Sequence, residues 1–220
     1  FYKLRNLLGF TLFLTCLFFS LWCISNLISW FSFLGSNTMM FGWSLTYLLY
    51  ILFSVFAYYF LHIFVTKKDL PVWQKITGLT LISPIVYETI AGANLLLFDA
   101  NYCEAWENEF SNNYLFYLVA FLLVAIIIFT SYQYRKSVNS THRRETLLIG
   151  TGVFLFIGFF LSSSLVTQFL LNYESLAQYA YNYEIYGLFG MPILLIFLGY
   201  LIVRYKAFDL KVFGAQALIT

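Results

Sequence analysis

Six long apolar runs dominate the sequence and limit the folds that it can adopt. A helix needs about 20 consecutive apolar residues to cross the hydrocarbon core of a bilayer. The runs are continuous and do not alternate apolar with polar residues, which favours helices over the strands of a membrane barrel. We therefore predict an all-α fold, a polytopic membrane helix bundle with six transmembrane helices at residues 7–30, 41–65, 76–98, 114–134, 146–171 and 186–203.

The composition agrees with a membrane-embedded chain. Hydrophobic residues make up 61% of it and charged residues only 10%, whereas about 25% of the residues of a soluble domain are charged. So few charges cannot cover a surface in water, and we expect the lipid bilayer to be the main partner. The net charge of +2 gives no general attraction to nucleic acid.

The basic residues predict the orientation of the bundle. Lysine and arginine in short loops mark the cytoplasmic side of a membrane protein. All twelve basic residues precede the first run or follow the second, fourth or sixth run, whereas the remaining connections carry acidic residues. Both ends of the chain are therefore expected in the cytoplasm. The basic residues are Lys3, Arg5, Lys67, Lys68, Lys75, Arg135, Lys136, Arg143, Arg144, Arg204, Lys206 and Lys211.

Glu88 is the acidic residue that lies deepest within a predicted span. Burial of a charge there costs about 2.5–3.5 kcal/mol on insertion scales, so Glu88 must face the bundle. Tyr87 and Asn94 are seven residues apart and are expected on one helical face beside it. These three residues form a candidate ligand or sensing site. The alternative interpretation is that Glu88 is a structural polar link to another helix.

Catalytic and metal-binding patterns are missing from the sequence. It contains no HExxH, no GxSxG, no glycine-rich phosphate loop and no kinase motif. The three cysteines form no CxxC pair and the two histidines are far apart. We expect a non-catalytic segment with no metal and no cofactor.

The C-terminal stretch combines apolar and charged residues in a helical pattern. After Arg204, the residues Phe208, Val212, Ala215 and Ile219 recur at spacings of four, three and four, as in a coiled-coil seam. The alternative is an interfacial helix that lies on the bilayer. We predict a transmembrane bundle over residues 1–203 and the start of a cytoplasmic signalling helix over 204–220.

The same stretch, "LGYLIVRYKAFDLKVFGAQALI", resembles the end of the seven-helix N-terminal membrane region of bacterial sensor histidine kinases. That family closes its last helix with an arginine–tyrosine pair and an aspartate, here Arg204, Tyr205 and Asp209. Three further features are similar: a tryptophan in an early helix, a basic stretch before the penultimate helix, and a proline early in the last helix, here Trp22, His142-Arg143-Arg144 and Pro192.

The resemblance implies a sensory domain of the bacterial cytoplasmic membrane. The family has seven helices, so this chain would hold helices two to seven, without the first helix and without the output domain. A stimulus would pass through the last helix and through Arg204, Tyr205 and Asp209 to a cytoplasmic signalling domain of the same chain, in a homodimer. The alternative function is a small transporter or channel, because Gly187, Gly190 and Pro192 loosen the start of the sixth run.

Overall fold

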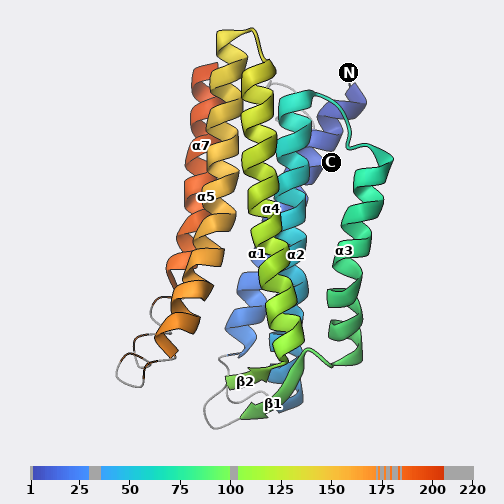
Figure 1. The fold of residues 1–220 in the computed structure, drawn as a ribbon, viewed down its shortest axis with the longest axis vertical. Coiled ribbons are helices and arrows are strands. Elements are labelled where there is room, and N and C mark those ends of the chain that lie inside the picture. The colour runs from blue at the N-terminus through green and yellow to red at the C-terminus, as the bar shows by residue number, and fades with distance from the viewer. Residues whose placement is uncertain are drawn as a thin grey trace, which may run out of the picture. The chain divides into compact units, whose positions relative to one another are not determined.

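The computed structural model describes residues 2–29, 36–99, 104–171, 173, 176, 179, 183 and 185–205. Six α-helices account for most of this part of the chain, which confirms the main feature of the predicted all-α fold. A short 3-10 helix and two strands complete it (Figure 1). The elements are α1 Tyr2–Ser29, α2 Ser36–Thr66, α3 Val72–Ala91, β1 Leu95–Asp99, β2 Glu104–Glu107, α4 Glu109–Lys136, α5 Ser140–Leu171, η1 Ile185–Phe189 and α7 Gly190–Tyr205.

Four of the helices in the described part of the chain are long and apolar enough to cross a membrane. They are the segments Leu7–Ile28, Asn37–Thr66, Glu109–Lys136 and Ser140–Leu170. The apolar helix at Tyr186–Leu201 is shorter, and α3 contains Gln74, Lys75 and Glu88 together with several threonines. The predicted first, second, fourth and fifth spans thus coincide with helices of sufficient length and hydropathy.

The third predicted span is wrong at its C-terminal end. Helix α3 stops at Ala91 because Gly92 adopts a left-handed conformation with φ of 64°, and its amide donates to the carbonyl of Thr89. The following residues form β1, which pairs antiparallel with β2 and has an irregular register between Leu95 and Leu97. An apolar run as short as "LLLF" fits a strand and a helix equally well, so periodicity did not separate them.

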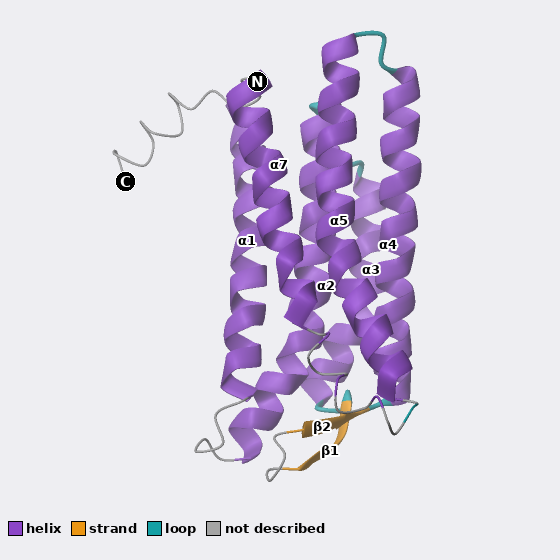
Figure 2. Cartoon of the chain, turned by 90° about the vertical axis from the view of Figure 1, so that its left-hand side faces the viewer, coloured by secondary structure: helices purple, strands orange, loops and turns teal. Residues whose placement is uncertain are grey.

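The chain divides into two compact units, residues 1–124 and 125–220, and the boundary falls inside α4. In the first unit, α1 packs along α2 through aromatic rings. Phe53 of α2 is fully buried, and its ring lies 5.8 Å from that of Phe19 and 6.3 Å from that of Trp22. The α2–α3 connection lies at one end of this unit and the β1–β2 hairpin at the opposite end (Figures 1 and 2).

The second unit contains the end of α4 together with α5, η1 and α7. Its helices approach one another closely at glycines: a Cβ atom on Gly190 would lie 2.5 Å from the carbonyl oxygen of Phe156. On Gly152 it would lie 2.9 Å from Cβ of Phe197. Small residues allow such backbone-to-backbone packing in membrane helices. Helix α7 is therefore fixed against α5 along its length.

Candidate functional site

The polar side chains of the first unit gather where α3, the hairpin and α4 meet. Glu88, in the last turn of α3, accepts a hydrogen bond of 2.6 Å from the hydroxyl of Ser111. Ser111 is fully buried in the first turn of α4. Three residues further along α4, the hydroxyl of Tyr114 donates to the carbonyl of Leu81 at 2.8 Å. These two bonds join α3 to α4 near the hairpin.

Asn94 lies in the loop between α3 and β1, with only 1% of its surface exposed. Its Oδ1 accepts from the Ser44 hydroxyl at 2.7 Å, and its Nδ2 donates to the Ser44 carbonyl at 3.0 Å. The amide of Asn108 donates to the Asn94 carbonyl at 2.9 Å. Asn94 thus ties the loop to α2. The expectation that it shares a helical face with Tyr87 is wrong, because α3 ends before it at Ala91.

Tyr87 is 70% exposed. The three candidate residues therefore do not converge on one space: Glu88 bonds to α4, Asn94 bonds to α2, and Tyr87 lies on the outer surface. The first two residues position the hairpin end of the unit. Their partners Ser44 and Ser111 were not predicted, because the sequence around a serine carries no signal of its distant contact.

Asn108 begins α4 and was also not predicted as part of this network. Its Oδ1 accepts from the amide of Phe110 at 3.0 Å, and its Nδ2 donates to the carbonyl of Ala93 at 2.9 Å. The first contact is typical of a helix N-cap. The sequence did contain a signal for this cap. An asparagine that precedes an acidic residue and then a long apolar run is typical of the start of a helix.

Glu107, at the end of β2, is a partly buried carboxyl group. Burial raises its pKa above the ordinary glutamate value, and a hydrogen bond from Tyr47 of α2 works in the opposite direction. The folded state therefore shifts this group toward its neutral form relative to an exposed glutamate. Glu107 was not predicted as part of the site, since its burial depends on how the hairpin packs against α2.

An open hollow of about 560 Å³ lies beside this network along the first two turns of α4. It combines amide and carboxylate groups with aromatic rings, a mixture that suits a small polar molecule with an apolar part. Tyr114 both lines the hollow and bonds to α3, so a molecule bound there would touch the α3–α4 junction. The lining residues are Asn108, Glu109, Phe110, Asn113, Tyr114 and Tyr117.

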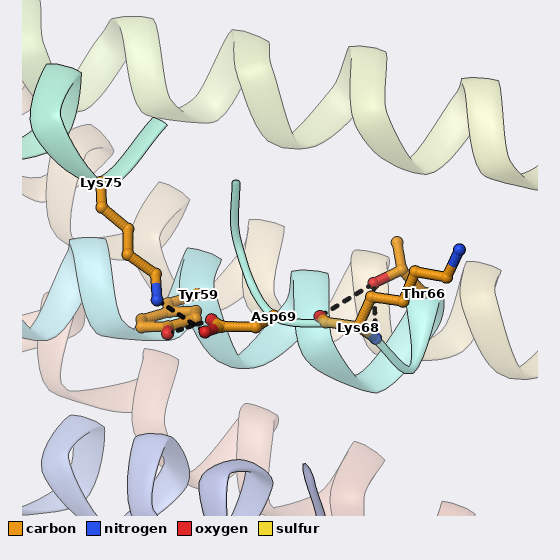
Figure 3. A network of polar contacts seen from close by, with 5 residues as sticks. All are labelled: Tyr59, Thr66, Lys68, Asp69 and Lys75. Carbon is orange, nitrogen blue, oxygen red and sulfur yellow. Dashed lines mark hydrogen bonds and ion pairs between the residues drawn. The ribbon is translucent and has the colours of Figure 1, made fainter. Parts of the chain in front are cut away.

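A second polar network closes the α2–α3 connection at the opposite end of the unit (Figure 3). Asp69 accepts hydrogen bonds from the Tyr59 hydroxyl at 2.5 Å and from Lys75 Nζ at 2.6 Å. Partial burial works against ionisation of Asp69, but these hydrogen bonds prevail and hold its pKa below the usual range. Thr66 Oγ1 accepts from the amide of Lys68 at 3.2 Å. The turn is thus closed by its own side chains.

The structure describes only part of the three residues predicted to relay the signal, Arg204, Tyr205 and Asp209. The backbone of Arg204 and Tyr205 belongs to the last turn of α7. Their side chains, and the whole of Asp209, lie outside the described residues. Within the part of the chain that the structure describes, no group of histidine, cysteine, aspartate and glutamate side chains could hold a metal ion.

Taken together, these helices and networks define a helical protein of membrane type. No family model, no curated protein and no solved structure matches the chain.

Proposed function

We propose that this chain is the membrane-embedded sensory region of a bacterial signalling protein. Its six helices cross the cytoplasmic membrane, and both ends of the chain lie in the cytoplasm. The last helix relays a stimulus to an output domain, such as a histidine kinase, in the same polypeptide. The region acts as a homodimer and is itself not catalytic.

The observation that carries this proposal is the sequence that follows the apolar part of α7. The helix is apolar up to Val203, its described part ends at Tyr205, and residues 200–213 contain neither proline nor glycine. The seam residues Phe208, Val212, Ala215 and Ile219 follow in register. A helix that continues from a membrane bundle into a seam can pass a shift or rotation to an attached domain.

The close packing of α7 on α5 supports this route. Gly190 brings the start of α7 against the backbone of Phe156, and Gly152 brings α5 against Phe197 in the middle of α7. Tightly packed elements have discrete arrangements and do not deform continuously. A displacement of one helix of this pair therefore displaces the other.

The proposed six crossings include α3 and the shorter η1–α7 segment. With six crossings, all twelve basic residues lie on one side of the membrane. Removal of α3 from the count would place the lysines of the α2–α3 connection opposite the arginines of the α4–α5 connection. The charge pattern thus favours six crossings.

The α4 hollow and the Glu88–Ser111 bond are the proposed place where a stimulus acts. They lie next to the hairpin, at the end of α3 and the start of α4. The hairpin lies at the opposite end of the first unit from the α2–α3 connection (Figure 1). In the proposed orientation this end faces the outside of the cell. A molecule in the hollow would contact Tyr114 and so change the α3–α4 junction.

A chimera with a histidine-kinase core tests the relay. The chain is fused through residue 220 to the core, and residues are inserted next to Phe208. A two-residue insertion rotates the seam by about 200° and is expected to change kinase output, whereas a seven-residue insertion restores the heptad register and preserves it. Output that is indifferent to the two-residue insertion would contradict relay through α7.

A small transporter remains the second candidate because the last helix begins irregularly. The 3-10 segment η1 precedes α7, and Gly187 lies within it. Interrupted helices are typical of transporter binding sites. Solute flux in liposomes, compared between the natural chain and Glu88→Gln, distinguishes this function from sensing.

A further inference from the structure

We propose that the α4–α5 connection binds the phosphate-bearing headgroup of an anionic phospholipid, with Arg143 as the central contact. The surface, here called the α4–α5 basic surface, comprises Arg135 and Lys136 at the end of α4 and Arg143 and Arg144 in the first turn of α5. This inference is independent of the sensory proposal, because it concerns what the connection binds and not what the chain transmits.

The charge of this surface is not neutralised by the protein. Among the described residues of the second unit, Glu145 is the only acidic side chain, and its Oε2 lies 3.8 Å from His142 Nδ1. None of the four basic residues forms an ion pair within the described part of the chain. Four neighbouring cations without a counterion attract an anion from outside the chain.

Arg143 is held in an orientation that suits phosphate. Its guanidinium carbon lies 4.5 Å from the centre of the Tyr134 ring, so the cation lies over the face of the ring. Its Nε is buried and has no hydrogen-bond partner among the described residues. A guanidinium that lies over an aromatic ring can still donate from its edge in the forked geometry that phosphate accepts. A bound phosphate oxygen would relieve the cost of an unpaired buried donor.

The start of α5 adds to the attraction. The positive end of a helix dipole favours anions, and the first turn of α5 contains no acidic residue. Thr146, three residues after Arg143 on the same helical face, is fully buried, and its Oγ1 has no partner in the described chain. An unpaired arginine nitrogen and an unpaired hydroxyl thus lie within one turn of each other.

The apolar side chains beside the connection favour a lipid over free phosphate. Ile127 and Ile128 of α4 and Leu147 of α5 are about half exposed or more. Both helices are apolar enough to cross a bilayer, so their shared end lies at the depth of the headgroups. A ligand with an anionic head and an apolar tail matches both parts of this surface.

The test uses native mass spectrometry of the full chain in a non-ionic detergent. Dioleoyl phosphatidylglycerol and dioleoyl phosphatidylcholine share their acyl chains and differ in headgroup charge. We expect phosphatidylglycerol to bind at least about 25-fold more tightly, since each of the two central arginines contributes roughly fivefold. The variant Arg143→Gln/Arg144→Gln is expected to lose about 25-fold in affinity for phosphatidylglycerol and nothing for phosphatidylcholine.

The matched control is Lys67→Gln/Lys68→Gln, which removes two charges from the other connection and is expected to change affinity by less than about twofold. Arg143→Lys keeps the charge but loses the planar guanidinium, and is expected to lose about threefold. If the double glutamine variant does not fold, the affinity of Arg143→Lys for phosphatidylglycerol tests the proposal in its place.

Three results would overturn the proposal. They are equal affinity for the two lipids, equal losses in the two double variants, and unchanged binding in Arg143→Lys. Displacement of phosphatidylglycerol by an equal concentration of inorganic phosphate would show a free-phosphate site and would overturn the choice of a lipid.

Discussion

The α2–α3 and α4–α5 connections have similar basic sequences but are built differently. In the first, Lys75 pairs with Asp69, and Lys67 lies over the Phe64 ring with its Nζ 4.3 Å from the ring centre. In the second, Asn139 caps α5 and no carboxylate pairs with the arginines among the described residues. Two helices can thus be joined in two ways. One is an ion-paired clasp, here the contacts of Asp69 with Lys75 and Tyr59, and the other is a helix cap with close packing. The first connection pairs one of its lysines with a carboxylate, whereas among the described residues the second pairs none of its four basic side chains.

The largest expected effect tests the close packing near the α4–α5 connection. A Cβ atom on Gly150 would lie 2.5 Å from Thr130 Oγ1, so Gly150→Val is expected to destabilise the chain by about 1–3 kcal/mol through overpacking. Gly158→Ala, in the same helix with open space around it, should be neutral or stabilising by up to about 1 kcal/mol. Unfolding in detergent by denaturant measures both. Equal changes in the free energy of unfolding for the two variants would mean that the close packing at Gly150 does not stabilise the α4–α5 helix pair.

The second prediction concerns the cap of α5. Asn139 Oδ1 accepts from the amide of Thr141 at 2.9 Å, and the Asn139 carbonyl accepts from the amide of Arg143 at 2.9 Å. Asn139→Ala is expected to cost about 1 kcal/mol, whereas Asn139→Ser should cost a few tenths at most. Helix α3 begins after Pro71 without a side-chain cap, so Pro71→Ala is the corresponding change. A cost for Pro71→Ala as large as that for Asn139→Ala would remove this difference between the connections.

The third prediction opens the ion-paired clasp. Asp69→Asn removes the partner of Lys75, and since both side chains are more than one third exposed, we expect a loss of only about 0.5 kcal/mol. The variant should also gain affinity for phosphatidylglycerol, because Lys75 loses its counterion. Native mass spectrometry measures this gain. A larger gain in Lys75→Gln than in Asp69→Asn would contradict the role of Asp69 as a counterion.

The smallest expected effect is the pH dependence of the same clasp. The folded state lowers the pKa of Asp69 below its ordinary value of about 3.8, so the contribution of the clasp is fully present above that pH. It is lost as the pH falls through the lower folded-state pKa. The stability difference between the natural chain and Asp69→Asn should therefore shrink below about pH 3.8. A difference that grows on acidification would contradict the assigned direction.

The long helices could be predicted from sequence because lipid imposes their length and composition on continuous runs of residues. The hairpin was missed because "LLLF" continues an apolar run, and only the left-handed Gly92 and the pairing with β2 end the helix. Glu88 was recognised from its charge alone. Its partner Ser111 was not, since a contact between residues 23 positions apart depends on how α3 packs against α4.

The central claim is that α3 crosses the membrane, so that both basic connections lie on one side. Single cysteines at Lys68, Val138 and Trp106, in a chain whose native cysteines are replaced by alanine, are labelled with a membrane-impermeant maleimide in intact cells. Trp106 and Val138 are 60% and 99% exposed and are therefore accessible to reagent. We predict labelling of the Trp106 position in intact cells, and of the Lys68 and Val138 positions only after permeabilisation. Labelling of Lys68 and Val138 from opposite sides would show that α3 does not cross, and would contradict the account.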